Sequence, residues 1–91
     1  MLRRNSISPS AAAALAYESR ANDPIVVSAV LATADRDRGT SARYACGIRV
    51  WRRTVVVYVR RRAMLPSQSL SQGVFFVGRF RDGYHVWQVV H

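Results

Sequence analysis

Apolar and polar residues alternate most regularly at the C-terminus of the chain. Two alternating runs, Gly73 to Arg81 and Tyr84 to His91, flank the dipeptide Asp82-Gly83. Alternation with a period of two is typical of β-strands, and Asp-Gly between two such runs is a strong signal for a two-residue hairpin turn. The sequence therefore predicts a β-hairpin here.

The register of this hairpin gives its strands two different faces. Arg81 pairs with Tyr84 and Gly78 with Trp87, so that the Trp87 ring covers the bare Gly78 position. The face expected to be core carries Val74, Phe76, Gly78, Phe80, His85, Trp87 and Val89. The other face carries Phe75, Val77, Arg79, Arg81, Tyr84, Val86, Gln88 and Val90. Because exposed strands rarely hold so many apolar side chains together, we expect another surface to cover this second face.

A second hairpin is predicted over Ala42 to Arg62, with its turn around Trp51 to Thr54. Pairing Val50 with Val55 produces an apolar face on which Ile48 meets Val57, Cys46 meets Val59 and Tyr44 meets Arg61. The opposite face is basic and aromatic, with Arg43, Arg49, Tyr58, Arg60 and Arg62. Arg52 and Arg53 rarely adopt positive φ, so a four-residue loop or a bulge is expected at the turn.

The first third of the chain predicts one helix and one strand. Ala11 to Arg20 has high helix propensity, with Ser8 or Ser10 as its cap. Its expected buried face is small and consists of Ala13, Leu15, Ala16 and Tyr17. The breaker Asn22-Asp23-Pro24 is followed by Ile25 to Thr33, which is apolar on both faces and predicts a central or doubly covered strand.

These elements predict an α+β fold, in which an N-terminal helix is followed by about five mostly antiparallel strands that form a curved sheet or small barrel. The chain has 91 residues, too few for two independent cores. We divide it into a basic, Ser- and Ala-rich N-terminal segment of residues 1–22 with a helix and a single β-rich domain of residues 23–91.

The charge of the chain is strongly positive, with 14 basic and 5 acidic residues and a net charge of +9. Every basic residue is arginine. Two explanations remain open. A GC-rich or overlapping coding sequence writes basic positions as arginine, whereas selection for function favours the guanidinium group because it binds phosphates and carboxylates through two hydrogen bonds and stacks on aromatic rings.

Few residues of the chain are suited to catalysis or to metal binding. Cys46 is the single cysteine and lies in an apolar stretch, which favours a buried small side chain in a reducing compartment. His85 faces Phe80 across the predicted hairpin, which favours a hydrogen-bonded core or rim histidine over a general base. No phosphate-binding loop, metal-ligand spacing or nucleophile motif is present. We predict that the protein is not an enzyme and needs no cofactor.

The location of the protein in the cell is predicted from the same features. No apolar run approaches the roughly 20 residues of a membrane span. A cytoplasmic protein is expected, with a mitochondrial location as the alternative because the N-terminus is rich in Arg and Ser and poor in acids.

Three functions are open at this point. The first is nucleic-acid binding, to RNA rather than DNA and within a ribonucleoprotein, through Arg43, Arg49, Tyr58, Arg60, Arg62, Arg79 and Arg81. The second is a protein-interaction or homo-oligomeric module that meets acidic partners and uses as its interface Phe75, Val77, Tyr84, Val86 and Val90. The third is a curved sheet that binds a small ligand between helix and sheet, near Trp87 and His85.

Overall fold

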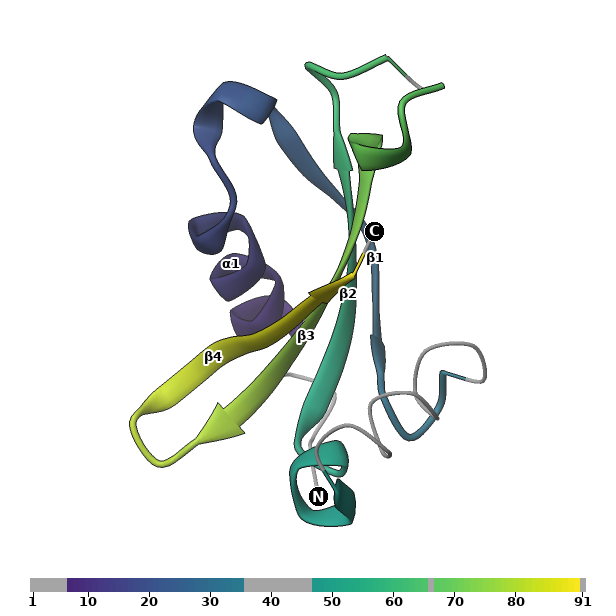
Figure 1. Cartoon of the computed structure of the whole chain (residues 1–91). Coiled ribbons are helices and arrows are strands. Elements are labelled where there is room, and N and C mark those ends of the chain that lie inside the picture. The colour runs from purple at the N-terminus through teal and green to yellow at the C-terminus, as the bar shows by residue number, and fades with distance from the viewer. Residues whose placement is uncertain (1–6, 36–46, 66, 91) are drawn as a thin grey trace.

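One helix lies against an antiparallel sheet whose strands follow one another in chain order (Figure 1). The computed structural model describes residues 7–35, 47–65 and 67–90. Its elements are helix α1 (Ile7–Tyr17), the short 3-10 helix η2 (Arg20–Asn22), strands β1 (Pro24–Leu31) and β2 (Thr54–Arg61), the 3-10 helix η3 (Ser69–Ser71), and strands β3 (Gln72–Phe80) and β4 (Gly83–Val90). The α+β class is confirmed. The described residues form an open sheet of order β1-β2-β3-β4, so the fifth strand and the barrel-like curvature are not confirmed.

Strand β2 lies inside the sheet because its sequence is apolar on both faces. Val55, Val56 and Val57 have no exposed surface. A strand of this kind is stable where both faces are covered and both edges are paired. β2 therefore pairs antiparallel with β1 on one side and with β3 on the other.

The predicted hairpin over Ala42 to Arg62 is wrong. Val55 pairs with Leu31 of β1, and residues 47–51, which include Val50, form a helical turn. Ile48, which was expected to face Val57, is 44% exposed. The physical reason is that β2 needs a partner that is itself a regular apolar strand, and β1 supplies one. Arg43, Tyr44 and Cys46 lie outside the described residues.

Strand β1 is an edge strand and not the doubly covered strand that its apolar sequence predicts. It ends at Leu31 and has no described partner on its outer side. Val26 pairs with Val59 and Ser28 with Tyr58, so Val27 forms a bulge and is 65% exposed. A bulge bends an edge strand and reduces its capacity to pair with another chain.

The C-terminal hairpin is confirmed, although its register differs from the predicted one. Arg79 pairs with Tyr84 and Phe80 with Gly83, so the turn consists of Arg81 and Asp82. Gly83 has φ +129°, a backbone angle that side chains disfavour, and this places the glycine at the first paired position.

The register shifts again at Trp87, where β4 bulges. Phe76 pairs with Gln88, Val77 pairs with Val86, and Trp87 stands between them. Its indole nitrogen donates a hydrogen bond of 3.2 Å to Oγ1 of Thr54. A Cβ at Gly78 would lie 2.8 Å from Phe80 Cε2 and 3.1 Å from Trp87 Cδ1, so the tryptophan covers the bare glycine together with Phe80, although Gly78 pairs with His85 and not with Trp87 as predicted.

Helix α1 covers the face of the sheet that was expected to need a cover, here called the helix face. Phe75, Val77 and Val55 pack there with Ala14 of the helix. The helix starts earlier than predicted and buries a different stripe, Ser10 and Ala14, whereas Leu15, Ala16 and Tyr17 are exposed. These small side chains let the helix backbone approach the sheet closely.

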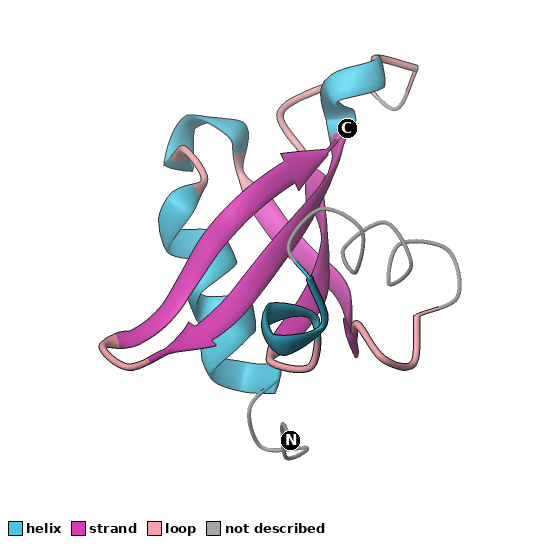
Figure 2. Cartoon of the chain, turned by 60° about the horizontal axis from the view of Figure 1, so that its bottom comes forward, coloured by secondary structure: helices cyan, strands magenta, loops and turns pink. Residues whose placement is uncertain are grey.

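A second core cluster lies on the opposite side of the sheet, here called the far face. Val56, Val74, Phe76 and Ala32 are buried in it, and half-buried Trp51 and Trp87 pack against them. Trp51 comes from the helical turn of residues 47–51, which lies on the side of the sheet opposite α1 (Figure 2). Both faces of β2 and β3 are thus core, where the sequence predicted one.

Candidate functional site

The structure separates the arginines that were predicted to form one basic face. Arg60 and Arg62 lie at the C-terminal end of β2, whereas Arg49 precedes its N-terminal end. Arg79 and Arg81 lie beside that N-terminal end, because Thr54 pairs with Gly78 of β3. An eight-residue strand separates the two groups by roughly 20 Å. Arg43 lies outside the described residues.

At the C-terminal end of β2, Arg61 is buried and ion-paired. Its Nε donates to Oε1 of Glu18 at 2.7 Å and its Nη2 to Oε2 at 3.1 Å, and each side chain is under a tenth exposed. Nη1 donates to the Leu70 carbonyl at 2.8 Å. A Cβ at Gly73 would lie 2.8 Å from Arg61 Nη2, so the guanidinium occupies space that only glycine leaves open. Arg61 therefore fastens the chain after α1 to the sheet.

Arg62, the next residue, is also neutralised, but in solvent. Its Nη2 donates to Oδ1 of Asp23 at 2.8 Å, and both side chains are at least half exposed. Asp23 closes the η2 helix in the left-handed conformation with φ 48°, which Asp tolerates better than most residues. The charge of Arg62 is thus partly cancelled, and an exposed pair of this kind adds little stability.

Five arginines gather at the other end of the sheet, and we call this group the basic end: Arg49, Arg52, Arg53, Arg79 and Arg81. The backbone N–H of Arg79 donates to the Arg53 carbonyl at 2.9 Å, which fixes the segment before β2 against the last residues of β3. All five side chains are exposed. None of the five forms an ion pair within residues 7–35, 47–65 and 67–90.

The acid in the β3–β4 turn is already engaged. Asp82 Oδ1 lies 2.9 Å from Nε2 of His85, and this hydrogen bond, with help from the Asp82 backbone, lowers the pKa of the carboxyl group below 3.8. The histidine is hydrogen-bonded, as expected, but it is exposed and lies outside the core. The turn therefore holds its carboxylate in a hydrogen bond with His85, beside Arg81.

Helix α1 adds a further positive contribution at the basic end. Its C-terminal side lies near Arg61, through Glu18, so its first turn lies near the start of β2, as Figure 1 shows. The first turn of a helix carries a partial positive charge. This end of the molecule therefore presents positive potential from the backbone as well as from the side chains.

The apolar residues predicted as a protein interface lie mostly under α1. Phe75 and Val77 have no exposed surface, and Tyr84 and Val86 pack against the same cluster. Val90 packs on the far face, because the bulge at Trp87 reverses the alternation of β4. The surface that was predicted to cover this face is therefore the chain's own helix α1.

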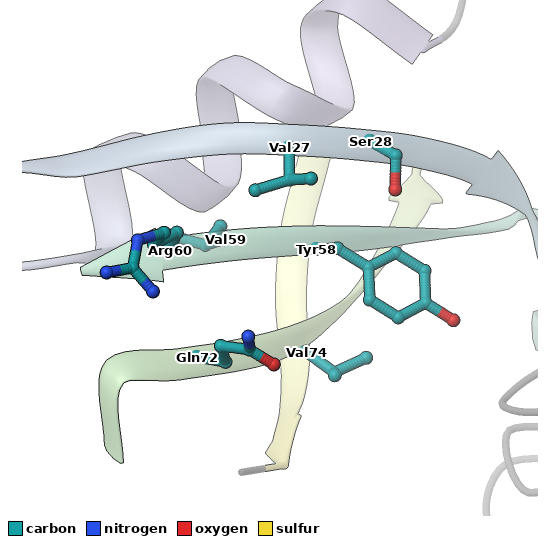
Figure 3. A pocket seen from close by; sticks show the side chains of 8 residues that line it. Val27, Ser28, Tyr58, Val59, Arg60, Gln72 and Val74 are labelled. Atoms are coloured by element: carbon teal, nitrogen blue, oxygen red, sulfur yellow. The ribbon is translucent and has the colours of Figure 1, made fainter. Parts of the chain in front are cut away.

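Sequence reasoning treated Arg52 and Arg53 as turn residues and left them out of the basic site. Their position beside Arg79 depends on the pairing of β2 with β3, and the only local signal was the Arg-Arg dipeptide itself. Tyr58 and Arg60, in contrast, lie together on the far face and line one pocket (Figure 3).

Comparison with known protein families, with curated proteins and with solved structures found no match to this chain. Among the described residues, no cluster of His, Cys, Asp and Glu could hold a metal ion. No helix in this part of the chain has the length and apolar character needed to span a membrane. The functional argument therefore rests on the placement of the arginines.

Proposed function

We propose that the protein binds single-stranded RNA by contacting its phosphates with the basic end. The observation that carries this proposal is the gathering of five exposed arginines, from two segments of the chain, with no ion pair to any described acid. At the other end of β2, Glu18 and Asp23 neutralise neighbouring arginines, at Arg61 and Arg62. Guanidinium groups bind phosphate oxygens through two parallel hydrogen bonds.

The expected binding is strongly dependent on salt. Each phosphate neutralised on a single strand contributes about 0.7 to the slope of log K against log salt concentration. Five such contacts lower the affinity roughly a hundredfold between about 50 and 200 mM salt. Binding with this slope and little preference for sequence is the expected behaviour of a site made from exposed arginines.

The test is an anisotropy titration of a labelled single-stranded RNA with the full chain and two charge-matched variants. Arg52→Gln/Arg53→Gln removes two charges at the basic end and should weaken binding about tenfold at low salt. Arg20→Gln/Arg62→Gln removes two exposed charges at the other end and should weaken it less than twofold. Equal losses in the two variants, or no binding at about 50 mM salt, contradict the proposal.

The same titration identifies the competing type of partner. If the protein binds polyglutamate and not RNA, the basic end is a surface for an acidic protein. A homo-oligomer through the face of Phe75 and Val77 would first require α1 to leave the sheet, since the helix buries both residues.

A further inference from the structure

A pocket of about 310 Å³ opens on the far face of the sheet, toward the C-terminal end of β2 (Figure 3). We call it the far-face pocket. Its lining comes from three neighbouring strands and includes Val27 and Ser28 of β1, Tyr58 and Arg60 of β2, and Gln72 and Val74 of β3. A volume of this size is at the lower end of the range for small-molecule sites.

The bulge in β1 shapes one side of this pocket. Val27 has no partner in the register between β1 and β2, and both Val27 and Ser28 are exposed. A bulged strand bends locally and redirects its side chains. The edge of the pocket is therefore built into the backbone and does not depend on the positions of long side chains.

The pocket is electrostatically polar along β2. The hydroxyl of Tyr58 donates a hydrogen bond to the carboxylate of Asp35, and Arg60 extends toward the opposite end of the pocket. Arg60 is half-buried and forms no ion pair within the described part of the chain. A bound anion is therefore attracted to the Arg60 end of the pocket.

Between these two ends the lining is mainly apolar. The Tyr58 ring, held by its bond to Asp35, lies beside Val74, and Figure 3 shows Val27 on β1 between Arg60 and Tyr58 along the pocket. An aromatic ring and valine side chains suit a flat, weakly polar group. The Gln72 amide and the Ser28 hydroxyl supply hydrogen-bond donors and acceptors for the edge of such a group.

We infer that the far-face pocket binds one nucleotide of the RNA, with its base against the Tyr58 ring and its phosphate at Arg60. This inference rests on the proposed function and adds a site for a base to a surface that otherwise contacts only phosphates. Stacking on an aromatic ring and neutralisation of phosphate by arginine are the two interactions by which proteins hold single strands.

The two sites are separated along β2. Arg53 and Arg60 stand at opposite ends of β2, and seven steps of strand separate them by roughly 23 Å. An RNA strand that contacts both sites must therefore span several nucleotides. A strand too short to reach from one site to the other should bind to each of them weakly.

The test is a titration of the full chain, labelled with 15N, with uridine monophosphate while the amide signals are followed by NMR. Signals of Tyr58, Arg60 and Gln72 should shift, and Arg60→Gln should raise Kd about tenfold. Tyr58→Leu should raise it at least fivefold, whereas Tyr58→Phe, which keeps the ring, should raise it less. Arg62→Gln, which removes the neighbouring exposed charge, is the matched control and should leave Kd within twofold of the original.

Two further ligands separate the contributions of base and phosphate. The affinity for ribose 5-phosphate should fall in Arg60→Gln but not in Tyr58→Leu. The affinity for uridine should fall in Tyr58→Leu but not in Arg60→Gln. If uridine monophosphate shifts no pocket signal, or binds Arg60→Gln as well as the original chain, the inference is overturned.

The outcome also distinguishes this inference from the proposed function. If RNA binds and is weakened by Arg52→Gln/Arg53→Gln while the mononucleotide leaves the pocket unchanged, the pocket inference fails and the basic end stands. If the mononucleotide binds through Arg60 while RNA does not bind, the proposed function fails and the pocket becomes a site for a free nucleotide.

Discussion

The two ends of strand β2 use arginine in opposite ways. At the C-terminal end, Arg61 and Arg62 are ion-paired with acids of the segment that follows α1, Glu18 and Asp23. At the N-terminal end, Arg52 and Arg53 face solvent beside Arg79, without an ion pair to any described acid. The same residue type therefore holds the fold together at one end and leaves charge available at the other.

The difference shows that a net charge of +9 does not by itself describe a binding surface. The chain has few acids, and two of them are ion-paired with arginines, one in a buried pair and one in an exposed pair. The positions of the acids therefore decide which arginines keep an uncompensated charge. To find the binding surface of a basic protein, one must first establish which basic side chains its carboxylates neutralise.

The largest expected effect comes from breaking the buried ion pair. Glu18→Gln leaves the Arg61 guanidinium buried without its counter-charge, which costs about 3 to 5 kcal/mol of unfolding free energy. Urea denaturation followed by circular dichroism measures it. The double variant Glu18→Gln/Arg61→Met also removes the buried, unpaired charge of Arg61, and it should recover part of the lost free energy of unfolding.

If Glu18→Gln costs less than about 1 kcal/mol, the pair behaves as an exposed one and the contrast between the two ends disappears. Arg62→Gln provides the control at the adjacent position. It removes an exposed pair and should cost less than about 1 kcal/mol.

The second effect concerns affinity and leaves stability nearly unchanged. Arg79→Gln/Arg81→Gln should reduce the slope of log K for RNA against log salt concentration by roughly 1.4, because two phosphate contacts are lost. The anisotropy titration repeated at several salt concentrations measures this slope. An unchanged slope would show that Arg79 and Arg81 do not contact the phosphates. The two ends of β2 would then not differ in function.

The smallest effect is a dependence on pH at the basic end. The hydrogen bond to His85 lowers the pKa of Asp82 in the folded protein below 3.8. The stability that this bond adds is therefore present above pH 3.8 and is lost as the pH falls through the lowered pKa. The Tm of the original chain should be slightly higher than that of Asp82→Asn above pH 3.8, and the two values should converge at lower pH. A gap that persists into stronger acid would show that Asp82 acts through its turn geometry alone.

Local patterns predicted the fold only where the contacts are local. Asp82-Gly83 marked the position of the C-terminal hairpin correctly, because the signal for a short turn is local. The register was missed at the turn itself, where Arg81 and Asp82 are the two central residues, and it shifts again at the Trp87 bulge, which depends on Thr54 in another strand. Likewise, the apolar run of β2 predicted a strand but did not identify its partner, because β1 is distant in the sequence.

The candidate site was predictable in part for the same reason. Arg79 and Arg81 were predicted as charges on a regular strand, and the structure places Arg81 in the turn that follows it. The contribution of Arg53 depends on its pairing with β3, and no neighbouring residue indicates it. The structural role of Arg61 was hidden as well, since Glu18 comes from the far end of the chain and no spacing rule connects the two.

The unequal connections between strands have a consequence for the order of folding. Only Arg81 and Asp82 join β3 to β4, whereas residues 32–53 join β1 to β2. Each doubling of a loop adds about 0.6 kcal/mol of closure entropy, so the C-terminal hairpin is the least costly pairing to form. We expect this hairpin to form first and β1 to close the sheet late. The bond between Glu18 and Arg61 is then among the last contacts to form, so its loss should speed unfolding more than it slows folding.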